Sequence, residues 1–363
     1  MSWQTTVEPV ARKILNEADV PGMLVAVQRD SGDPAGPGNA HAAPPLETLA
    51  LGTDARGQPL APHTLFPVAS ITKLATALCV LRLAGSGALS LRDLLSRYLP
   101  EAAAARPGVT LRALLSHIAG LPYDLSPRLA PYDRDLDWPT LRQACLQTPP
   151  TSPPGRHVLY SNLGPGLCAI VVERLTGQAF RDALSDLVLR PLGIEGCLGA
   201  EPPRIPAAIL QQPDGHTGTP LESYNSPFWR SLAMPWGGLV TTAAGAIALV
   251  RAFGGEPAGF LSPALLADAL RDQTVGLGGG FFEPLWWPRC PWGVGVELRG
   301  DKNPHWTLAQ AGPASYGHAG ASGCLVWRDP AAGLTYAILG TRTFESWWPR
   351  WPEIGEAILS AED

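Results

Sequence analysis

A serine and a lysine three residues apart, Ser70 and Lys73, stand at the start of a strongly apolar segment that predicts a helix over residues 71–83. Residues three apart share a helix face, so the serine hydroxyl and the lysine amine are expected within hydrogen-bond reach. A serine hydroxyl is a poor nucleophile without a base. A lysine buried on an apolar helix has a lowered pKa, and its neutral amine can accept the serine proton. The spacing therefore predicts a serine nucleophile with a lysine base.

The same spacing has a structural interpretation, in which Ser70 caps the helix and Lys73 is a solvated residue of its first turn. The composition favours the chemical interpretation, because only three of the 27 basic residues are lysines, Lys13, Lys73 and Lys302. The other basic residues are arginines, which stay protonated and cannot act as a base. The amino end of the helix would also present N–H groups that hold an oxyanion.

Tyr160 and Asn162 form a second candidate group, within residues 154–164. A phenol beside a lysine ammonium can ionise at a lower pH than usual and relay a proton to a leaving group. Asn162 can orient Lys73 and the carbonyl group of an ester or amide substrate. The ordinary alternative is a buried tyrosine that closes a loop, and this motif alone does not decide between the two.

The third candidate group is a run of small residues around a histidine, on a predicted strand: Gly317, His318, Ala319, Gly320 and Ala321. Small residues let a substrate lie close to the backbone. The N–H group of Ala321 is expected to oppose that of Ser70 as a second oxyanion donor. His318 is expected to face the cleft, and its structural alternative is a hydrogen-bonded histidine at a strand edge.

The two ends of the chain predict one sheet with terminal helices. The elements expected near the amino end are a helix over residues 5–17 and strands over residues 23–28 and 47–52. Those expected near the other end are strands over residues 315–320, 324–327 and 334–339 and a helix over residues 353–359.

The middle of the chain shows helical periodicity almost throughout. The periodic segments cover residues 71–83, 91–98, 111–116, 141–146, 164–175, 180–189 and 242–253. We therefore expect an α/β part plus an all-helical lobe, in which an antiparallel sheet flanked by N- and C-terminal helices receives a large, mostly helical insertion. The predicted domains are residues 1–88 with 288–363, discontinuous and α/β, and residues 89–287, mostly helical, with the active site in the cleft between them.

Segments rich in glycine, proline or aromatic residues predict loops over residues 31–45, 202–206 and 276–292. The aromatic rings of the last segment either line an apolar pocket or pack between the two lobes. Tyr224, Trp229 and Trp236 are candidate cleft residues by position alone.

Charge and hydropathy exclude several function classes. The net charge of −5 offers no basic surface for nucleic acid, and no apolar run reaches the length of a membrane span. The sequence starts without a basic and then apolar leader, which predicts a cytoplasmic protein. The six scattered cysteines predict reduced thiols, and the seven histidines form no ligand pair, so no metal or other cofactor is expected.

Together and in this order, the three candidate groups resemble the pattern of the serine β-lactamase and penicillin-binding-protein superfamily. The similarity is to the branch that holds class C β-lactamases, D-Ala-D-Ala carboxypeptidases, D-aminopeptidases and family VIII esterases. It extends to residues 64–66, 114–122, 237–243 and 292–295, and it covers residues 5–345. The resemblance implies a β-lactamase/transpeptidase-like fold and a small-molecule ester or amide as the substrate.

One departure from the class C pattern bears on the substrate. Class C β-lactamases are similar here except for a lysine in K-T-G, where this sequence has His318, Ala319 and Gly320. Histidine is mostly neutral near pH 7, so the cation that binds the β-lactam carboxylate is missing. The resemblance then implies a serine hydrolase of carboxylic esters, acting through an acyl-enzyme on Ser70.

Two alternatives stay open at this point. A D-amino-acid peptidase or amidase, or a weak β-lactamase, would use the same groups on an amide. A penicillin-binding or ligand-binding protein without turnover belongs to another class, and the joint presence of the three groups argues against it. An α/β-hydrolase is disfavoured because no G-x-S-x-G elbow occurs. No feature predicts an oligomeric state.

Overall fold

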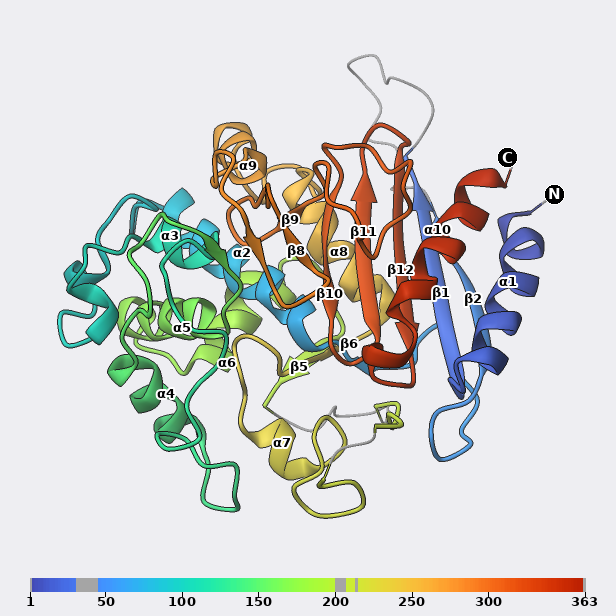
Figure 1. The fold of residues 1–363 in the computed structure, drawn as a ribbon, viewed down its shortest axis with the longest axis horizontal. Helices are drawn as coiled ribbons and strands as arrows, with labels where there is room; N and C mark the ends of the chain where they lie inside the picture. Colours follow the sequence, from blue (N-terminus) through green and yellow to red (C-terminus); the bar gives the residue numbers. More distant parts are fainter. Residues whose placement is uncertain (1, 31–44, 200–206, 213–214, 362–363) are drawn as a thin grey trace.

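A six-stranded antiparallel sheet joins the two ends of the chain in the computed structural model, which describes residues 2–30, 45–199, 207–212 and 215–361 (Figure 1). Its strands, in spatial order, are β2 (Glu47–Gly52), β1 (Gly22–Arg29), β12 (Leu334–Gly340), β11 (Cys324–Asp329), β10 (Tyr316–Gly320) and β9 (Glu297–Leu298). Strand β1 pairs with β12 along its length, from Met23 opposite Gly340 to Arg29 opposite Leu334. The sheet predicted from the two chain ends is confirmed.

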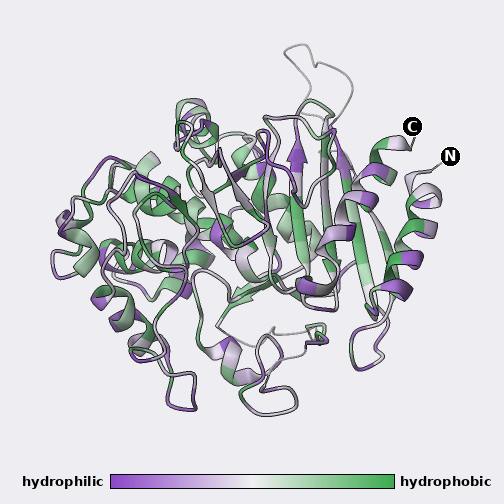
Figure 2. Ribbon diagram, viewed as in Figure 1, coloured by the Kyte–Doolittle hydropathy of each residue, from purple (hydrophilic) through white to green (hydrophobic). Residues whose placement is uncertain are grey.

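Helices cover both faces of this sheet. The terminal helices α1 (Trp3–Glu17) and α10 (Trp351–Ser360) pack on each other over one face, and α8 (Ala243–Phe253) packs on β1, β11 and β12. Because both faces are covered, β11 and β12 are buried at every position, and Figure 2 shows most of their length as hydrophobic. The terminal helices instead alternate hydrophobic and hydrophilic surfaces.

The helical part of the molecule lies to one side of the sheet (Figure 1). Its helices are α2 (Thr72–Gly85), α3 (Leu111–Leu115), α4 (Trp138–Gln147), α5 (Leu163–Thr176) and α6 (Phe180–Leu184). Helix α5 packs against α2, α3, α4 and α6 and is buried on all sides over its first ten residues. An apolar surface all round a helix is typical of this central position.

Short elements complete the fold. They are α7 (Pro227–Ser231), α9 (Pro263–Leu270), the small sheet of β3 (Phe66–Pro67), β6 (Leu239–Thr241) and β5 (Gly196–Leu198), and the small sheet of β4 (Val158–Leu159), β7 (Gly279–Gly280) and β8 (Trp286–Trp287). The predicted loop over residues 276–292 therefore contains two short strands. The predicted loops over residues 31–44 and 202–206 lie outside the described residues.

The helix predicted over residues 91–98 is wrong. Only a 3₁₀ turn forms there, Leu95–Arg97, because the backbone bonds across to residues 109–112 instead of within one helix. The Leu91 carbonyl accepts from the Arg112 amide at 2.9 Å, and the Leu95 amide donates to the Val109 carbonyl at 2.8 Å.

Helix α8 lies within residues 89–287, the predicted helical domain, although it packs on the sheet. The division into two domains stays a prediction. In the described part of the chain, no helix has the length and apolar character needed to cross a membrane. All six cysteines are free thiols, and five of them are buried.

Candidate active site

Ser70 lies in a 3₁₀ turn, Ala69–Ile71, that leads directly into α2. The preceding residue, Ala69, has a φ of +44°, a left-handed conformation that costs a non-glycine residue about 1–2 kcal/mol. The Thr72 hydroxyl holds this turn in place, because it donates to the Ala69 carbonyl at 2.6 Å and accepts from the Leu239 amide at 3.0 Å. The strained turn thus fixes Ser70 at the amino end of α2.

Lys73 points its amine at Ser70 and at two carbonyl oxygens. Its Nζ lies 3.0 Å from Oγ of Ser70, 2.7 Å from Oδ1 of Asn162 and 2.9 Å from the backbone oxygen of Trp236. The side chain is 2% exposed, and burial lowers the pKa of Lys73 well below its ordinary value, against the opposing charge of Asp124. A neutral amine has two N–H groups, which match the two carbonyl acceptors, and one lone pair, which is left for the serine hydroxyl.

A second buried lysine shows the contrasting case. Lys302 donates to Oε1 of Glu297 at 2.6 Å, and both side chains are fully buried. Burial alone would raise the pKa of Glu297, but Lys302 and His305 together lower it to about 2, so the carboxylate is ionised. The partners of Lys73 are a hydroxyl and two carbonyl oxygens instead. Of these two buried lysines, Lys73 is the one whose surroundings favour the neutral amine.

Asn162 stands at the N-cap position of α5, but its side chain makes no capping hydrogen bond. Asparagine at this position ordinarily caps the helix through its side-chain oxygen. Here that oxygen accepts from Lys73 instead, and the Leu163 amide at the start of the helix donates to the Ser161 hydroxyl at 3.1 Å.

Tyr160 follows β4 and is held by the small sheet, since its amide donates to the Gly280 carbonyl at 3.1 Å. The centre of its ring lies 4.7 Å from Nζ of Lys73. Burial raises the pKa of Tyr160 well above its ordinary value, and a hydrogen bond with Ser70 only partly opposes this effect. The raised pKa is contrary to the prediction of an easily ionised phenol, and its main cause is the burial of the phenol.

Strand β10 lies close against the turn that carries Ser70. A Cβ atom at Gly320 would lie 2.3 Å from the Val68 carbonyl oxygen, so only glycine allows this approach. Ala319, Gly320 and Ala321 all line the pocket that contains Ser70. The structure thus brings the small-residue strand to the nucleophile, as the sequence predicts.

Gly320→Ala is expected to lower both stability and activity. The added methyl group meets backbone, which cannot rotate away, and such overpacking costs about 1–3 kcal/mol. Thermal unfolding and kcat/KM on the same preparation would measure the two effects. Gly215→Ala is the control, since a Cβ atom there meets open space. A Gly320→Ala variant as stable and active as the Gly215→Ala variant would contradict the close approach.

His318 is not among the described residues that line the pocket, contrary to the expectation that it faces the cleft. It is fully buried, and its ring packs 5.9 Å from that of Tyr160 and 5.8 Å from that of Trp292. Burial is the main cause that lowers the pKa of His318 to about 4, so the imidazole is neutral near pH 7. Its Nε2 finds no hydrogen-bond partner among the described residues.

Comparison with known proteins agrees with this geometry. Residues 7–357 match the family model described as Beta-lactamase. The chain belongs to the β-lactamase family. Esterase EstB from Burkholderia gladioli is 32% identical in an alignment 324 residues long, which covers 80% of this chain and 80% of that protein. Penicillin-binding protein 4 from Amycolatopsis lactamdurans is 30% identical over 339 residues, which cover 89% of this chain and 81% of that protein.

One solved structure shares the fold of this chain. It is that of EstCE1, described as a hydrolase with promiscuous acyltransferase activity, with a TM-score of 0.75 at 22% sequence identity. The similarity covers 99% of this chain and 98% of that one. The predicted β-lactamase/transpeptidase-like architecture is confirmed.

Sequence reasoning missed two parts of this β-lactamase-family site. The first is the Trp236 carbonyl, which binds Lys73 and which any residue type would supply. The second is the aromatic lining added to the pocket by Tyr123, Trp306 and Phe344. Phe281 and Phe282 also line it, and they come from the segment whose rings the sequence assigned either to a pocket or to packing.

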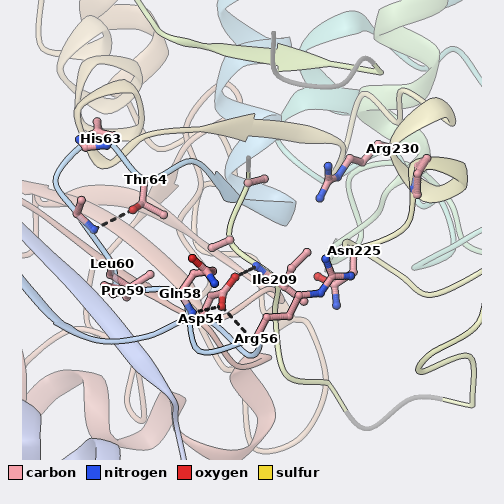
Figure 3. Close-up of a pocket in the computed structure, with 14 residues that line it drawn as sticks. Asp54, Arg56, Gln58, Pro59, Leu60, His63, Thr64, Ile209, Asn225 and Arg230 are labelled. Carbon is pink, nitrogen blue, oxygen red and sulfur yellow. Dashed lines mark hydrogen bonds between the residues drawn. The ribbon is translucent and has the colours of Figure 1, made fainter. Parts of the chain in front are cut away.

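A larger pocket, of about 560 Å³, lies between residues 54–64 and 225–230 (Figure 3). Its Asp54 carboxylate accepts hydrogen bonds from the amides of Arg56, Gln58 and Ile209, so this acid holds a loop together. The described lining contains none of the residues around Ser70. The smaller pocket, which contains Ser70, is therefore the candidate active site.

Proposed function

We propose that this chain hydrolyses uncharged carboxylic esters through an acyl-enzyme on Ser70. The hydrogen bonding of Lys73 carries the proposal, because two carbonyl acceptors take the N–H groups of the amine and leave its lone pair for the Ser70 hydroxyl. A nucleophile in contact with a buried, neutral base is the arrangement that acyl transfer requires.

In the acylation half, Oγ of Ser70 attacks the ester carbonyl carbon while its proton passes to Nζ of Lys73. The N–H groups of Ser70 and Ala321 hold the negative charge that develops on the carbonyl oxygen. When the C–O bond of the ester breaks, the Lys73 ammonium returns the proton to the leaving alcohol, with the neutral Tyr160 hydroxyl as the relay. The products of this half are the alcohol and an acyl group on Ser70.

In the deacylation half, water replaces the alcohol. Tyr160 and Lys73 take a proton from this water as its oxygen attacks the acyl carbon, and the same proton then returns to Oγ of Ser70. One water is consumed and one carboxylic acid is released, so the site ends as it began. No step needs a cofactor.

The charge of the site supports esters over β-lactams or peptides with a free carboxylate. His318 is neutral, and none of the ten described residues lining the pocket is charged. Two acidic residues also act on the site, Asp124 on Lys73 and Glu345 on Tyr123. An anionic substrate would lack a cationic partner here. The name of the related EstB also supports an ester substrate. A cytoplasmic location stays a prediction.

A three-substrate comparison tests the proposal. We expect kcat/KM for p-nitrophenyl acetate to exceed the values for nitrocefin and for D-alanyl p-nitroanilide by about 100-fold or more. All three reactions release a coloured product and can be followed on one enzyme preparation. Faster hydrolysis of nitrocefin would instead indicate a β-lactamase. Faster hydrolysis of the D-alanyl amide would indicate a D-amino-acid peptidase or amidase.

Asn162→Asp is expected to move the pH dependence of activity upward. It places a carboxylate at the position 2.7 Å from Nζ of Lys73, which stabilises the ammonium and raises the pKa of Lys73. The base is active when deprotonated, so kcat/KM rises with pH through this pKa and the rising limb moves to higher pH. A shift of about 1–3 pH units would lower kcat/KM about 10- to 1,000-fold on the acid side of the limb.

The control is Asn16→Asp, which changes an exposed residue of α1 in the same way. The pH profile separates the electrostatic effect from a loss of folded protein, because unfolding lowers the amplitude of the profile without moving its limb. An Asn162→Asp profile that coincides with the parent profile would show that Lys73 is not the titrating base.

A further inference from the structure

Aromatic rings dominate the pocket beside Ser70. They are six of its ten described lining residues, whereas aromatic residues make up 7% of the chain. The six are Tyr123, Tyr160, Phe281, Phe282, Trp306 and Phe344. The open space amounts to about 30 Å³, which is room for about two water molecules. In this structure the space next to the nucleophile is therefore both apolar and narrow.

The inner wall of this pocket is fixed by ring packing. The ring of Phe281 lies 4.3 Å from that of Tyr160 and 5.0 Å from that of Trp306, centre to centre. Trp306 is only 2% exposed, and the Phe281 amide donates to the Leu285 carbonyl at 3.0 Å. Rings buried and interlocked in this way can move little without loss of packing.

Phe282 and Phe344 form a different kind of wall, which we call the aromatic rim. Their rings meet edge to face with centres 6.3 Å apart, and Phe282 is 42% exposed. They come from separate segments, the strand-poor stretch between β7 and β8 and the turn Phe344–Ser346. The rim thus lies on the solvent side of the pocket, where one pair of rings narrows the way in.

The aromatic rim is hydrogen-bonded to the residue proposed to bind the carbonyl oxygen of the ester. The Phe344 amide donates to the Ala321 carbonyl at 3.1 Å, and Ala321 is the residue whose own N–H is proposed to bind the substrate carbonyl oxygen. In the mechanism proposed above, the alcohol leaves toward Tyr160, which pairs with Phe281 on the inner wall. The group of the ester that meets the rim is therefore the acyl chain.

We propose that Phe282 and Phe344 set the upper size limit of the acyl group that this enzyme accepts. A compact, uncharged acyl group fits beside Ser70, whereas a longer chain or an aromatic acyl group has to displace the rim. This inference rests on the proposed ester hydrolysis and adds to it the residues that select the substrate.

The test is a series of p-nitrophenyl esters with one alcohol and growing acyl groups: acetate, butyrate, octanoate and benzoate. Phe282→Ala and Phe344→Ala should each raise the ratio of kcat/KM for octanoate to that for acetate about tenfold or more. The ratio is taken within each variant, so a change in rate that is common to both esters cancels. Phe282→Trp enlarges the rim and should lower the ratio. The matched control is Leu94→Ala, which removes another exposed apolar side chain, in the helical part.

Each outcome separates this inference from the proposed function. Acetate hydrolysis with the same chain-length ratio in all rim variants would overturn the size limit and leave the ester hydrolase intact. Failure of the parent protein to hydrolyse every ester would overturn the proposed function itself. A second series, acetate esters of phenol and of 1-naphthol, varies only the alcohol. Rim variants that change preference in this series and not in the acyl series would overturn the assignment of the rim to the acyl chain.

Discussion

Replacing Ser70 by alanine is expected to lower kcat/KM for p-nitrophenyl acetate by about 10⁴- to 10⁶-fold. The variant keeps the pocket and the Lys73 amine but has no oxygen to form the acyl-enzyme. Fold stability should change little, because the Ser70 side chain is small and packs at the edge of the pocket. Initial rates of p-nitrophenolate release, measured beside thermal unfolding, give both quantities.

Ser86→Ala provides the matched control for this variant. Ser86 is exposed at the opposite end of α2, where its hydroxyl donates to the Leu83 carbonyl at 3.0 Å. Its loss should leave kcat/KM within about twofold, as surface substitutions ordinarily do. A Ser70→Ala enzyme that retains a tenth or more of the control activity would exclude Ser70 as the nucleophile.

Lys73→Arg is expected to lower kcat/KM by about 10²- to 10⁴-fold, the usual contribution of a positioned base. The guanidinium group can still donate to the Asn162 and Trp236 oxygens, but it stays protonated and has no lone pair for the serine proton. The rising limb that Lys73 gives the pH profile should disappear with the base. The measurement is the full pH profile of kcat/KM for the variant and for the parent protein.

Two further variants serve as comparisons for Lys73→Arg. Lys13→Arg repeats the substitution at an exposed position of α1 and should leave the profile unchanged. Lys73→Met keeps the approximate length of the side chain, but it deprives the buried Trp236 carbonyl of a donor, which should cost about 1–3 kcal/mol of stability. If Lys73→Arg keeps both its activity and its rising limb, the base is another group.

Much of the fold could be predicted because it follows from local patterns. Strand β2 begins and ends at the residues predicted for it, and α1 and α10 follow their apolar stripes. The contact between Ser70 and Lys73 could be predicted for the same reason, since it spans three residues at the start of one helix. The helix predicted over residues 91–98 failed because hydrogen bonds to a distant segment replaced the local ones.

What the sequence could not predict depends on tertiary burial. The pKa of Tyr160 is raised, and His318 is withdrawn from the pocket, because Trp292 and other rings pack around them. The residues next to Tyr160 and His318 in the sequence do not indicate either the raised pKa or the burial. The contact of Lys73 with the Trp236 carbonyl is equally hidden, because every residue type carries the same backbone oxygen. In the proposed mechanism, this carbonyl accepts one N–H group of Lys73, which helps to leave the lone pair of the amine for Ser70.

The most direct test of the central claim is covalent labelling of the intact protein with a fluorophosphonate, which forms a stable bond to an activated serine. Peptide mapping by mass spectrometry locates the label, and residual ester hydrolysis is measured on the same samples. The account predicts one label per chain on Ser70, loss of activity in proportion to labelling, and no labelling of the Lys73→Arg variant at the same exposure. Full activity after complete labelling of Ser70, or inactivation with the label on another residue, would contradict it.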